Sequence, residues 1–200
     1  MRVWPHFVED LHPATGWAPD QPDLGWLFVG RLSEEKGVNR LVREWPAGVP
    51  LTIIGTGPQE AATRDSARDK SIAFLGRLDR SSIASCMRRS IGLVFPSLSY
   101  ETFGLVYAES LSAGLPVLAW EPNVVSDAVL REGTGRSTTW GTDLHQTLRE
   151  CESLFPTLKL QCRAVFQEVY SEKAFLRRAE AYYGELVPSK TDTAEGTTPR

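Results

Sequence analysis

Residues 91–119, IGLVFPSLSYETFGLVYAESLSAGLPVLA, predict a strand, a loop, a helix and a second strand in succession. Ile91–Phe95 is a short run of apolar residues, as in a buried parallel strand. Pro96 ends this run, and the residues after it are polar. The following helix should end at Gly114, because a proline two residues later prevents its continuation. Val117–Ala119 is then the second strand.

The loop between the first strand and the helix can bind an anion. Free backbone N–H groups and the positive end of the helix dipole face such a loop. The candidate donors are the amides of Phe103, Gly104 and Leu105, and Gly104 would let a ligand approach the backbone closely. Two acids flank the loop, Glu101 before the helix and Glu109 inside it. Taken singly, each has an ordinary interpretation, as a helix-start acid or as a solvated helix residue.

The alternation of strands and helices extends over the rest of the chain. Further apolar runs occur at Trp26–Val29, Leu51–Ile54 and Ile72–Leu75. Helical spacing occurs at Val38–Trp45, Pro58–Asp69, Ser81–Arg89, Phe103–Ala113 and Val124–Arg131. From Asp143 to Leu186 the pattern is helical, with a break near Ser171 and no strand. Repeated strand–helix units predict an α/β, Rossmann-like parallel sheet with helices on both faces.

Composition excludes several classes of protein. The net charge of −3 gives no electrostatic case for nucleic-acid binding. No apolar run approaches the roughly 20 residues that would span a bilayer. The cysteines Cys86, Cys151 and Cys162 are odd in number and lack metal-binding spacing, which is typical of reduced thiols in a cytoplasmic protein. There is no Asp-x-Asp motif and the histidines are isolated, so we expect neither a metal nor a cofactor.

Two shorter motifs follow the first two strands. After the first strand come Gly30, Arg31 and Lys36, whose two cations could clamp a diphosphate or could belong to a solvated surface loop. The dinucleotide fingerprint G-x-G-x-x-G is absent. After the second strand, Gly55–Pro58 favours a tight turn with proline at the first helical position. Arg77 and Leu78 follow the third strand. A plain strand–helix turn is as good an interpretation of these residues as a contact with a ligand.

The central stretch resembles the nucleotide-sugar-dependent glycosyltransferases of the GT-B fold, specifically the retaining family 4 type. Their pattern is PS…E-x-FG…E…A-x-G-x-PV, with seven residues between the two glutamates. This chain matches the pattern at Pro96, Ser97, Glu101, Phe103, Gly104, Glu109, Gly114, Pro116 and Val117, with Ala113 directly before Gly114. The run FVGRL…EKG, which contains Gly30, Arg31 and Lys36, is similar to the family's donor loop.

The resemblance implies a role for each candidate residue. Arg31 and Lys36 would neutralise the leaving diphosphate, together with the amides of residues 103–105. Glu101 would bind sugar hydroxyls and fix the anomeric carbon, and Glu109 would bind the ribose. The backbone near Arg77 and Leu78 would meet the base. A retaining front-face mechanism needs no protein nucleophile, and no nucleophile is evident in the sequence.

The resemblance also predicts the domain organisation. Residues 1–24 are linker-like, and the run Val3–Glu9 within them resembles the segment that leads from the N-terminal domain of these enzymes into the C-terminal one. Residues 25–187 would form the nucleotide-sugar-binding domain. Residues 188–200 should be a disordered tail. The chain would thus be the C-terminal half of a GT-B enzyme. The family's acceptor-binding domain would come from elsewhere, such as a partner chain that docks beside Trp120 and the final helix.

The chain departs from the family pattern at two places. Ser90 and Ile91 replace the usual Ala-Asp, and Asn123–Asp127 replaces the usual Gly-Gly-x-x-Glu. Three functions stay open at this point: donor binding for transfer to a sugar or lipid-linked acceptor, a non-catalytic binding or docking module, and a glycosidase using Glu101 and Glu109. The glycosidase is the weakest, because it leaves the Arg31–Lys36 loop without a role.

Overall fold

The computed structural model describes residues 5–11, 23–98 and 103–186. Six parallel strands form one sheet in the order β3-β2-β1-β4-β5-β6. They are β1 (Trp26–Val29), β2 (Leu51–Ile54), β3 (Ile72–Gly76), β4 (Gly92–Phe95), β5 (Val117–Trp120) and β6 (Gly135–Thr138). The predicted Rossmann-like parallel sheet is therefore confirmed, and five strands lie where apolar runs predicted them. Glu101 and the C-terminal tail lie outside the described residues.

The sixth strand, β6, was not predicted. Its sequence, GRST, has no apolar residue, and it pairs with β5 as the edge of the sheet. Gly135 permits this pairing, because a Cβ there would lie 1.9 Å from the carbonyl oxygen of Val117. A short polar strand at a sheet edge carries no hydrophobic periodicity, which was the signal used for the other five.

Seven α-helices and two short helical turns connect or follow the described strands. The α-helices are α1 (Val38–Glu44), α2 (Glu60–Ser66), α3 (Arg80–Arg88), α4 (Leu105–Ser112), α5 (Val124–Glu132), α6 (Leu144–Val165) and α7 (Glu172–Leu186). The short turns are a 3-10 helix, η1 (Glu34–Lys36), and a π-helical turn, η2 (Phe166–Tyr170). The prediction that α2 begins at Pro58 was wrong by two residues.

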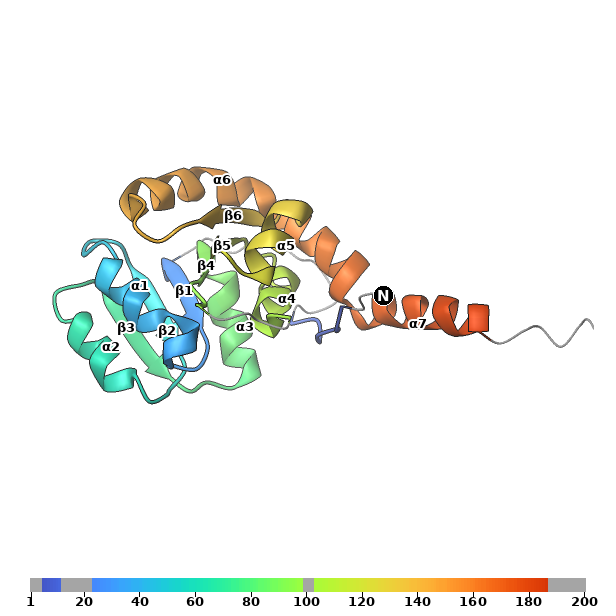
Figure 1. The fold of residues 1–200 in the computed structure, drawn as a ribbon, viewed down its shortest axis with the longest axis horizontal. Coiled ribbons are helices and arrows are strands. Elements are labelled where there is room, and N and C mark those ends of the chain that lie inside the picture. The colour runs from blue at the N-terminus through green and yellow to red at the C-terminus, as the bar shows by residue number, and fades with distance from the viewer. Residues whose placement is uncertain (1–4, 12–22, 99–102, 187–200) are drawn as a thin grey trace, which may run out of the picture.

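The helices cover both faces of the sheet (Figure 1). Successive side chains of a strand point to opposite faces. Leu27 accordingly belongs to the apolar cluster beneath α3, α4 and α5, whereas Trp26 and Phe28 belong to the cluster beneath α1 and the first half of α6. Phe155 of α6 packs on Trp26, with ring centroids 5.5 Å apart. These two clusters form the core.

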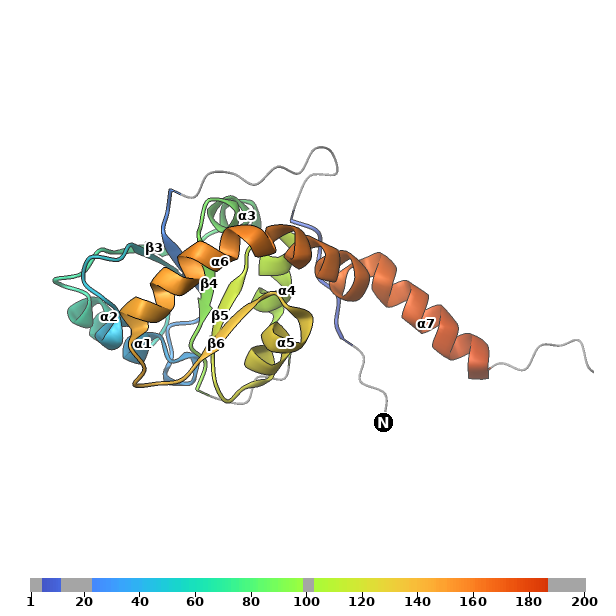
Figure 2. The same ribbon diagram turned by 90° about the horizontal axis from the view of Figure 1, so that it is seen from above.

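The C-terminal helices leave the sheet. The break predicted near Ser171 is confirmed, because the Ser171 hydroxyl accepts a hydrogen bond of 3.2 Å from the Ala174 amide at the start of α7. Beyond it α7 projects away from the sheet (Figures 1 and 2). No helix in the described ranges has the length and apolar character that crossing a membrane would need.

The N-terminal segment 5–11 runs along this end of the domain (Figure 2). The Val8 amide donates a hydrogen bond of 3.0 Å to the Tyr170 carbonyl, and the Val8 side chain is buried. The rings of Phe7 and Phe175 lie 5.1 Å apart. The segment is therefore anchored to both η2 and α7.

Candidate functional site

The most favourable position for a ligand is the point where the strand order changes direction. β1 continues to β2 on one side and pairs with β4 on the other. Parallel α/β sheets bind ligands at such switch points, beyond the carboxyl ends of the strands. A cavity of about 410 Å³ lies there. It is lined by Phe28, Val29, Gly30, Lys36, Val94, Phe95, Pro96, Ser97, Phe103, Gly104, Leu105, Val106 and Glu109. We call it the central cavity.

A second cavity of about 420 Å³ adjoins it and shares Val29 and Gly30. This side cavity is also lined by Arg31, Ile54, Gly55, Thr56, Arg77, Leu78 and Ile83. The candidate residues predicted from sequence thus gather around two neighbouring cavities, with the exception of Glu101, which lies outside the described residues. Lys36 and Arg31, expected to form one clamp, line different cavities.

The loops after β1 and β2 are held together by direct backbone contact. Gly55 has φ +133°, and a Cβ there would lie 1.9 Å from the Gly30 carbonyl oxygen. The Gly30 amide donates to the Ile54 carbonyl at 3.0 Å, and the Leu32 amide donates to the Thr56 carbonyl at 3.0 Å. The expected helix-start proline turn is thus a close-packed glycine loop, and it fixes the position of Gly30 in both cavities.

The turn that carries Lys36 is tied to the loop after β4. The Leu98 amide and the Ser97 hydroxyl both donate to the Glu35 carbonyl, at 2.8 and 3.1 Å. Gly37, with φ +67°, packs so closely that a Cβ would lie 2.1 Å from the Pro96 carbonyl oxygen. Lys36 is therefore brought to the rim of the central cavity by contacts between loops of two different strands.

The wall at the start of α4 contains Phe103 and Gly104. Gly104 has φ +73°, and a Cβ there would lie 2.6 Å from Cγ2 of Val125. The conformation and the packing against α5 both require glycine here. The close approach of a ligand to this glycine stays a prediction. The Phe103 ring packs edge-on against His6, at 5.3 Å, and against Tyr170, at 5.8 Å.

Glu109 faces the central cavity from α4, and its side chain is only 21% exposed. Burial raises the pKa of its carboxyl group, and the charge of Arg80 acts in the opposite direction. Nη2 of Arg80 lies 3.6 Å from Oε1 of Glu109. The solvated interpretation of Glu109 is therefore wrong. Arg80 itself was missed, because nothing in a helix-start arginine indicates a partner on another helix.

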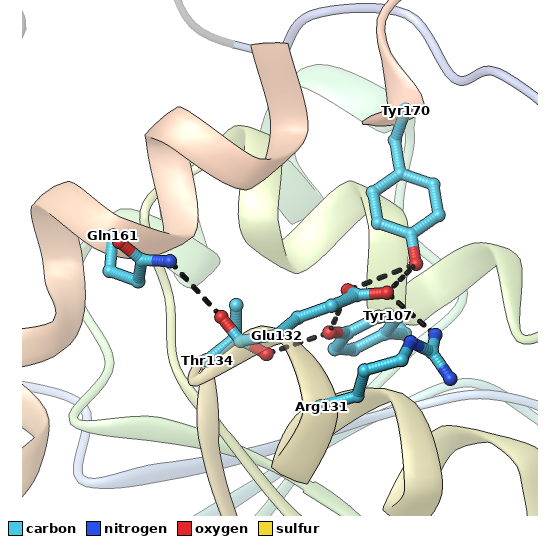
Figure 3. Close-up of polar contacts among 6 residues, drawn as sticks. All are labelled: Tyr107, Arg131, Glu132, Thr134, Gln161 and Tyr170. Carbon is cyan, nitrogen blue, oxygen red and sulfur yellow. Dashed lines mark hydrogen bonds and ion pairs between the residues drawn. The ribbon is translucent and has the colours of Figure 1, made fainter. Parts of the chain in front are cut away.

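A polar network around Glu132 was also missed (Figure 3). Tyr107 donates a hydrogen bond of 2.7 Å to one carboxylate oxygen of Glu132, and Tyr170 donates one of 2.8 Å to the other. The Tyr107 hydroxyl also lies 2.7 Å from that of Thr134, and Arg131 pairs with Glu132 at 2.8 Å. Burial raises the pKa of both phenols, with a further contribution from Glu132, so they remain protonated donors.

The remaining aromatic and titratable candidates are structural or solvated. Trp120 is only 2% exposed and its ring lies 5.2 Å from that of Trp140. The expectation that Trp120 flanks an exposed docking face is therefore wrong, because its side chain is buried. His145 is exposed on α6. Within the described ranges, no three His, Cys, Asp or Glu side chains gather in a way that could hold a metal ion.

Comparison with curated proteins identifies relatives that act on sugars. The chain is 38% identical over 122 residues to a glycogen synthase of Mycobacterium tuberculosis, a match that covers 56% of this chain and 29% of the synthase. It is 33% identical over 115 residues to a phosphatidyl-myo-inositol mannosyltransferase of Mycobacterium leprae, covering 54% of this chain and 30% of that protein. The chain thus spans about a third of the length of these relatives.

Comparison with solved structures supports the fold. The sucrose-phosphate synthase of Thermosynechococcus elongatus superposes with a TM-score of 0.66 at 24% identity, over 91% of this chain and 49% of that one. HepE of Anabaena, in complex with UDP and glucose, superposes with a TM-score of 0.66 at 18% identity, over 81% of this chain and 48% of that one. The expected resemblance to the C-terminal half of a GT-B fold is confirmed.

The family is decided by a match over more than half of the chain. The family model of the glycosyl transferases group 1 matches residues 24–148. That range contains both cavities, from β1 through α4, together with the paired strands β1 and β4 that meet at the switch point. The chain belongs to the glycosyl transferases group 1 family.

Proposed function

We propose that residues 25–187 bind a nucleoside diphosphate sugar and form the donor-binding domain of a retaining hexosyltransferase of the family 4 type. The observation that carries the proposal is the central cavity, where Lys36, the start of α4 and Glu109 meet at the switch point of the sheet. In its solved structure the neighbour HepE holds UDP and glucose. A nucleoside diphosphate sugar fits the chemistry of the lining, which offers a cation and backbone donors beside a carboxylate.

The diphosphate would lie between Lys36 and the first amides of α4. A helix N-terminus favours negative charge, and a positioned cation stabilises the charge that develops on the leaving diphosphate. Arg31 would reach the diphosphate from the side cavity. These groups replace the divalent metal that many diphosphate sites use, so the proposal requires no metal ion.

The two ends of the donor would be recognised separately. The Glu109 carboxylate would accept hydrogen bonds from the ribose hydroxyls, and Arg77 and Leu78 would surround the base in the side cavity. Glu101, from the loop outside the described residues, would hold the transferred sugar. The sugar would then pass to an acceptor on the same face, without a protein nucleophile.

The acceptor, a sugar or a lipid-linked sugar, would be held by a second domain, either elsewhere in the same protein or in a partner chain. We further propose a cytoplasmic location, because the three free cysteines Cys86, Cys151 and Cys162 are typical of a reducing compartment.

We expect at least one of UDP, GDP and ADP to bind without Mg²⁺. Titration calorimetry with each nucleotide, in the presence and absence of EDTA, measures this. The expected result is saturable binding of equal affinity under both conditions, because Lys36 and the α4 amides supply the compensating charge. If none of the three binds, the proposed function is wrong; if EDTA abolishes binding, its metal-free part is wrong.

Replacing either cation should weaken nucleotide binding while leaving the fold stable. Lys36→Ala and Arg31→Ala should each cost about 1.5–3 kcal/mol of binding free energy, the usual contribution of a charge-assisted hydrogen bond. Arg149→Ala, at an exposed position of α6, is the matched control and should leave the affinity unchanged. A fall in melting temperature without a loss of affinity would identify Lys36 or Arg31 as a structural residue.

A further inference from the structure

Arg80 links the N-terminal segment to the central cavity. Its guanidinium lies 2.7 Å from Oε2 of Glu9 and 3.6 Å from Oε1 of Glu109. The backbone beneath it is fixed, because the Asp79 carboxylate caps α3 by accepting a hydrogen bond of 2.8 Å from the Ser82 amide. Arg80 therefore extends from a well-defined helix start toward two carboxylates of different elements.

We propose that Arg80 is a positioning residue for Glu109. It holds the Glu109 carboxylate charged and directed into the central cavity, and Glu9 in turn holds Arg80. The inference rests on the proposed function, in which the Glu109 carboxylate accepts hydrogen bonds from the ribose hydroxyls. It adds a residue outside both cavity linings to the determinants of donor affinity.

The electrostatic reason is the partial burial of Glu109. A carboxyl group that is 21% exposed loses part of its hydration, which disfavours the ionised form and raises its pKa. A protonated carboxyl can accept fewer hydrogen bonds from the vicinal hydroxyls of a ribose. Arg80 opposes this protonation. Its own side chain is 60% exposed, so solvent screens the interaction and its effect should be moderate.

Other charged groups near Glu109 must be separated from Arg80. Lys36 is the other charged side chain of the described residues that lines the central cavity. Glu9 contacts Arg80, and Glu101 lies outside the described residues. The His6 ring contacts the Phe103 ring, which lines the same cavity, with ring centroids 5.3 Å apart. A His6→Gln background removes this imidazole from the measurements.

The first experiment needs no nucleotide. The Glu109 carboxyl is titrated by ¹³C NMR in the His6→Gln chain, with Glu109→Gln to assign its signal. Without Arg80 the carboxyl should take up its proton at a higher pH, so Arg80→Ala should raise the midpoint by about 0.5–1 pH unit. Arg80→Lys should restore most of the difference. An unchanged midpoint in Arg80→Ala overturns the inference.

The second experiment follows nucleotide affinity between pH 5 and 8 by calorimetry. Binding should weaken as pH falls through the Glu109 midpoint, and Arg80→Ala should move this loss to higher pH. At pH values below both Glu109 midpoints we expect the loss to reach about 3–10-fold, the ratio that corresponds to a midpoint shift of about 0.5–1 pH unit. Arg80→Lys should recover most of the affinity, and Arg149→Ala should resemble the original chain. Glu9→Gln should weaken binding when Arg80 is present and have no effect in Arg80→Ala.

The outcomes separate the inference from the proposed function. If the unmodified chain binds no nucleoside diphosphate, the proposed function fails, and the NMR titration still decides whether Arg80 sets the charge of Glu109. If the unmodified chain binds and Arg80→Ala binds with the same affinity and pH profile, the inference fails while the proposed function stands. A uniform loss at every pH, without recovery by Arg80→Lys, would show a structural role only and would also overturn the inference.

Discussion

The 200-residue chain on its own should bind a nucleoside diphosphate and yet transfer sugar at a negligible rate. The central cavity is lined by residues of one sheet, its loops and helix α4, and a second domain is proposed to hold the acceptor. Placing an acceptor against the anomeric carbon can be worth about 7–11 kcal/mol of the barrier. Without such placement, water reaches the anomeric carbon and the bound donor has no partner.

The measurement is sugar transfer from labelled donors to a panel of sugar and lipid-linked acceptors. Addition of a domain that carries the family's acceptor site should restore transfer by several orders of magnitude. Calorimetry on the same preparation is the control, because it shows that the donor was bound. Robust transfer by the 200 residues alone, monomeric by light scattering, would show that no second domain is needed.

Loss of the Glu132 carboxylate should be strongly destabilising. Its side chain is 11% exposed and accepts hydrogen bonds from the hydroxyls of Tyr107 and Tyr170. Glu132→Ala would leave the Tyr170 hydroxyl without this acceptor and would open space between α4, α5 and η2. Removing one partner of a buried hydrogen bond costs about 1–3 kcal/mol of stability for each polar group that is left unsatisfied. We expect the free energy of unfolding to fall by about 2–4 kcal/mol.

Urea denaturation of three variants tests this network. Tyr170→Phe removes one donor and leaves the carboxylate in place, so it should cost about 1 kcal/mol. Glu132→Gln preserves the shape of the side chain and one hydrogen-bond acceptor. Its loss of unfolding free energy should therefore lie between those of the other two variants. If Glu132→Ala unfolds at the same urea concentration as the unmodified chain, the network does not support the wall that Phe103 shares with Tyr170.

The sequence predicted the parts of the fold that carry apolar runs. β1, β2 and β4 are buried short strands, and each was recognised from its β-forming residues between turn signals. β6 could not be recognised in this way, because GRST pairs through its backbone at the sheet edge. The position of β6 depends on its pairing with β5 and on the close approach that Gly135 allows. Both are tertiary contacts, which a local sequence pattern does not show.

In the candidate site too, residues in local motifs were predicted and tertiary contacts were not. Gly30, Lys36 and Glu109 were predicted from motifs, and the structure brings them to one cavity. Arg80 was not predicted, because it lies at the start of α3 and its partner Glu109 lies inside α4, a helix remote in sequence. The local motif also suggested that Arg31 and Lys36 act together, but spacing along a loop does not say which side of the loop each side chain takes.

The pairing of β1 with β4 has a consequence for how the site comes into existence. β1, β2 and β3 are neighbours in the sequence as well as in the sheet, and so are β4, β5 and β6. Among the strands of the described residues, the pairing of Trp26 and Leu27 with Gly92 and Leu93 alone joins these halves. The central cavity lies on that seam, so neither half contains it alone. If a nucleoside diphosphate sugar binds there, as proposed, it stabilises the folded chain in which both halves are joined, by mass action. In a cell, the supply of activated sugar would then help to determine how much of the chain stays folded.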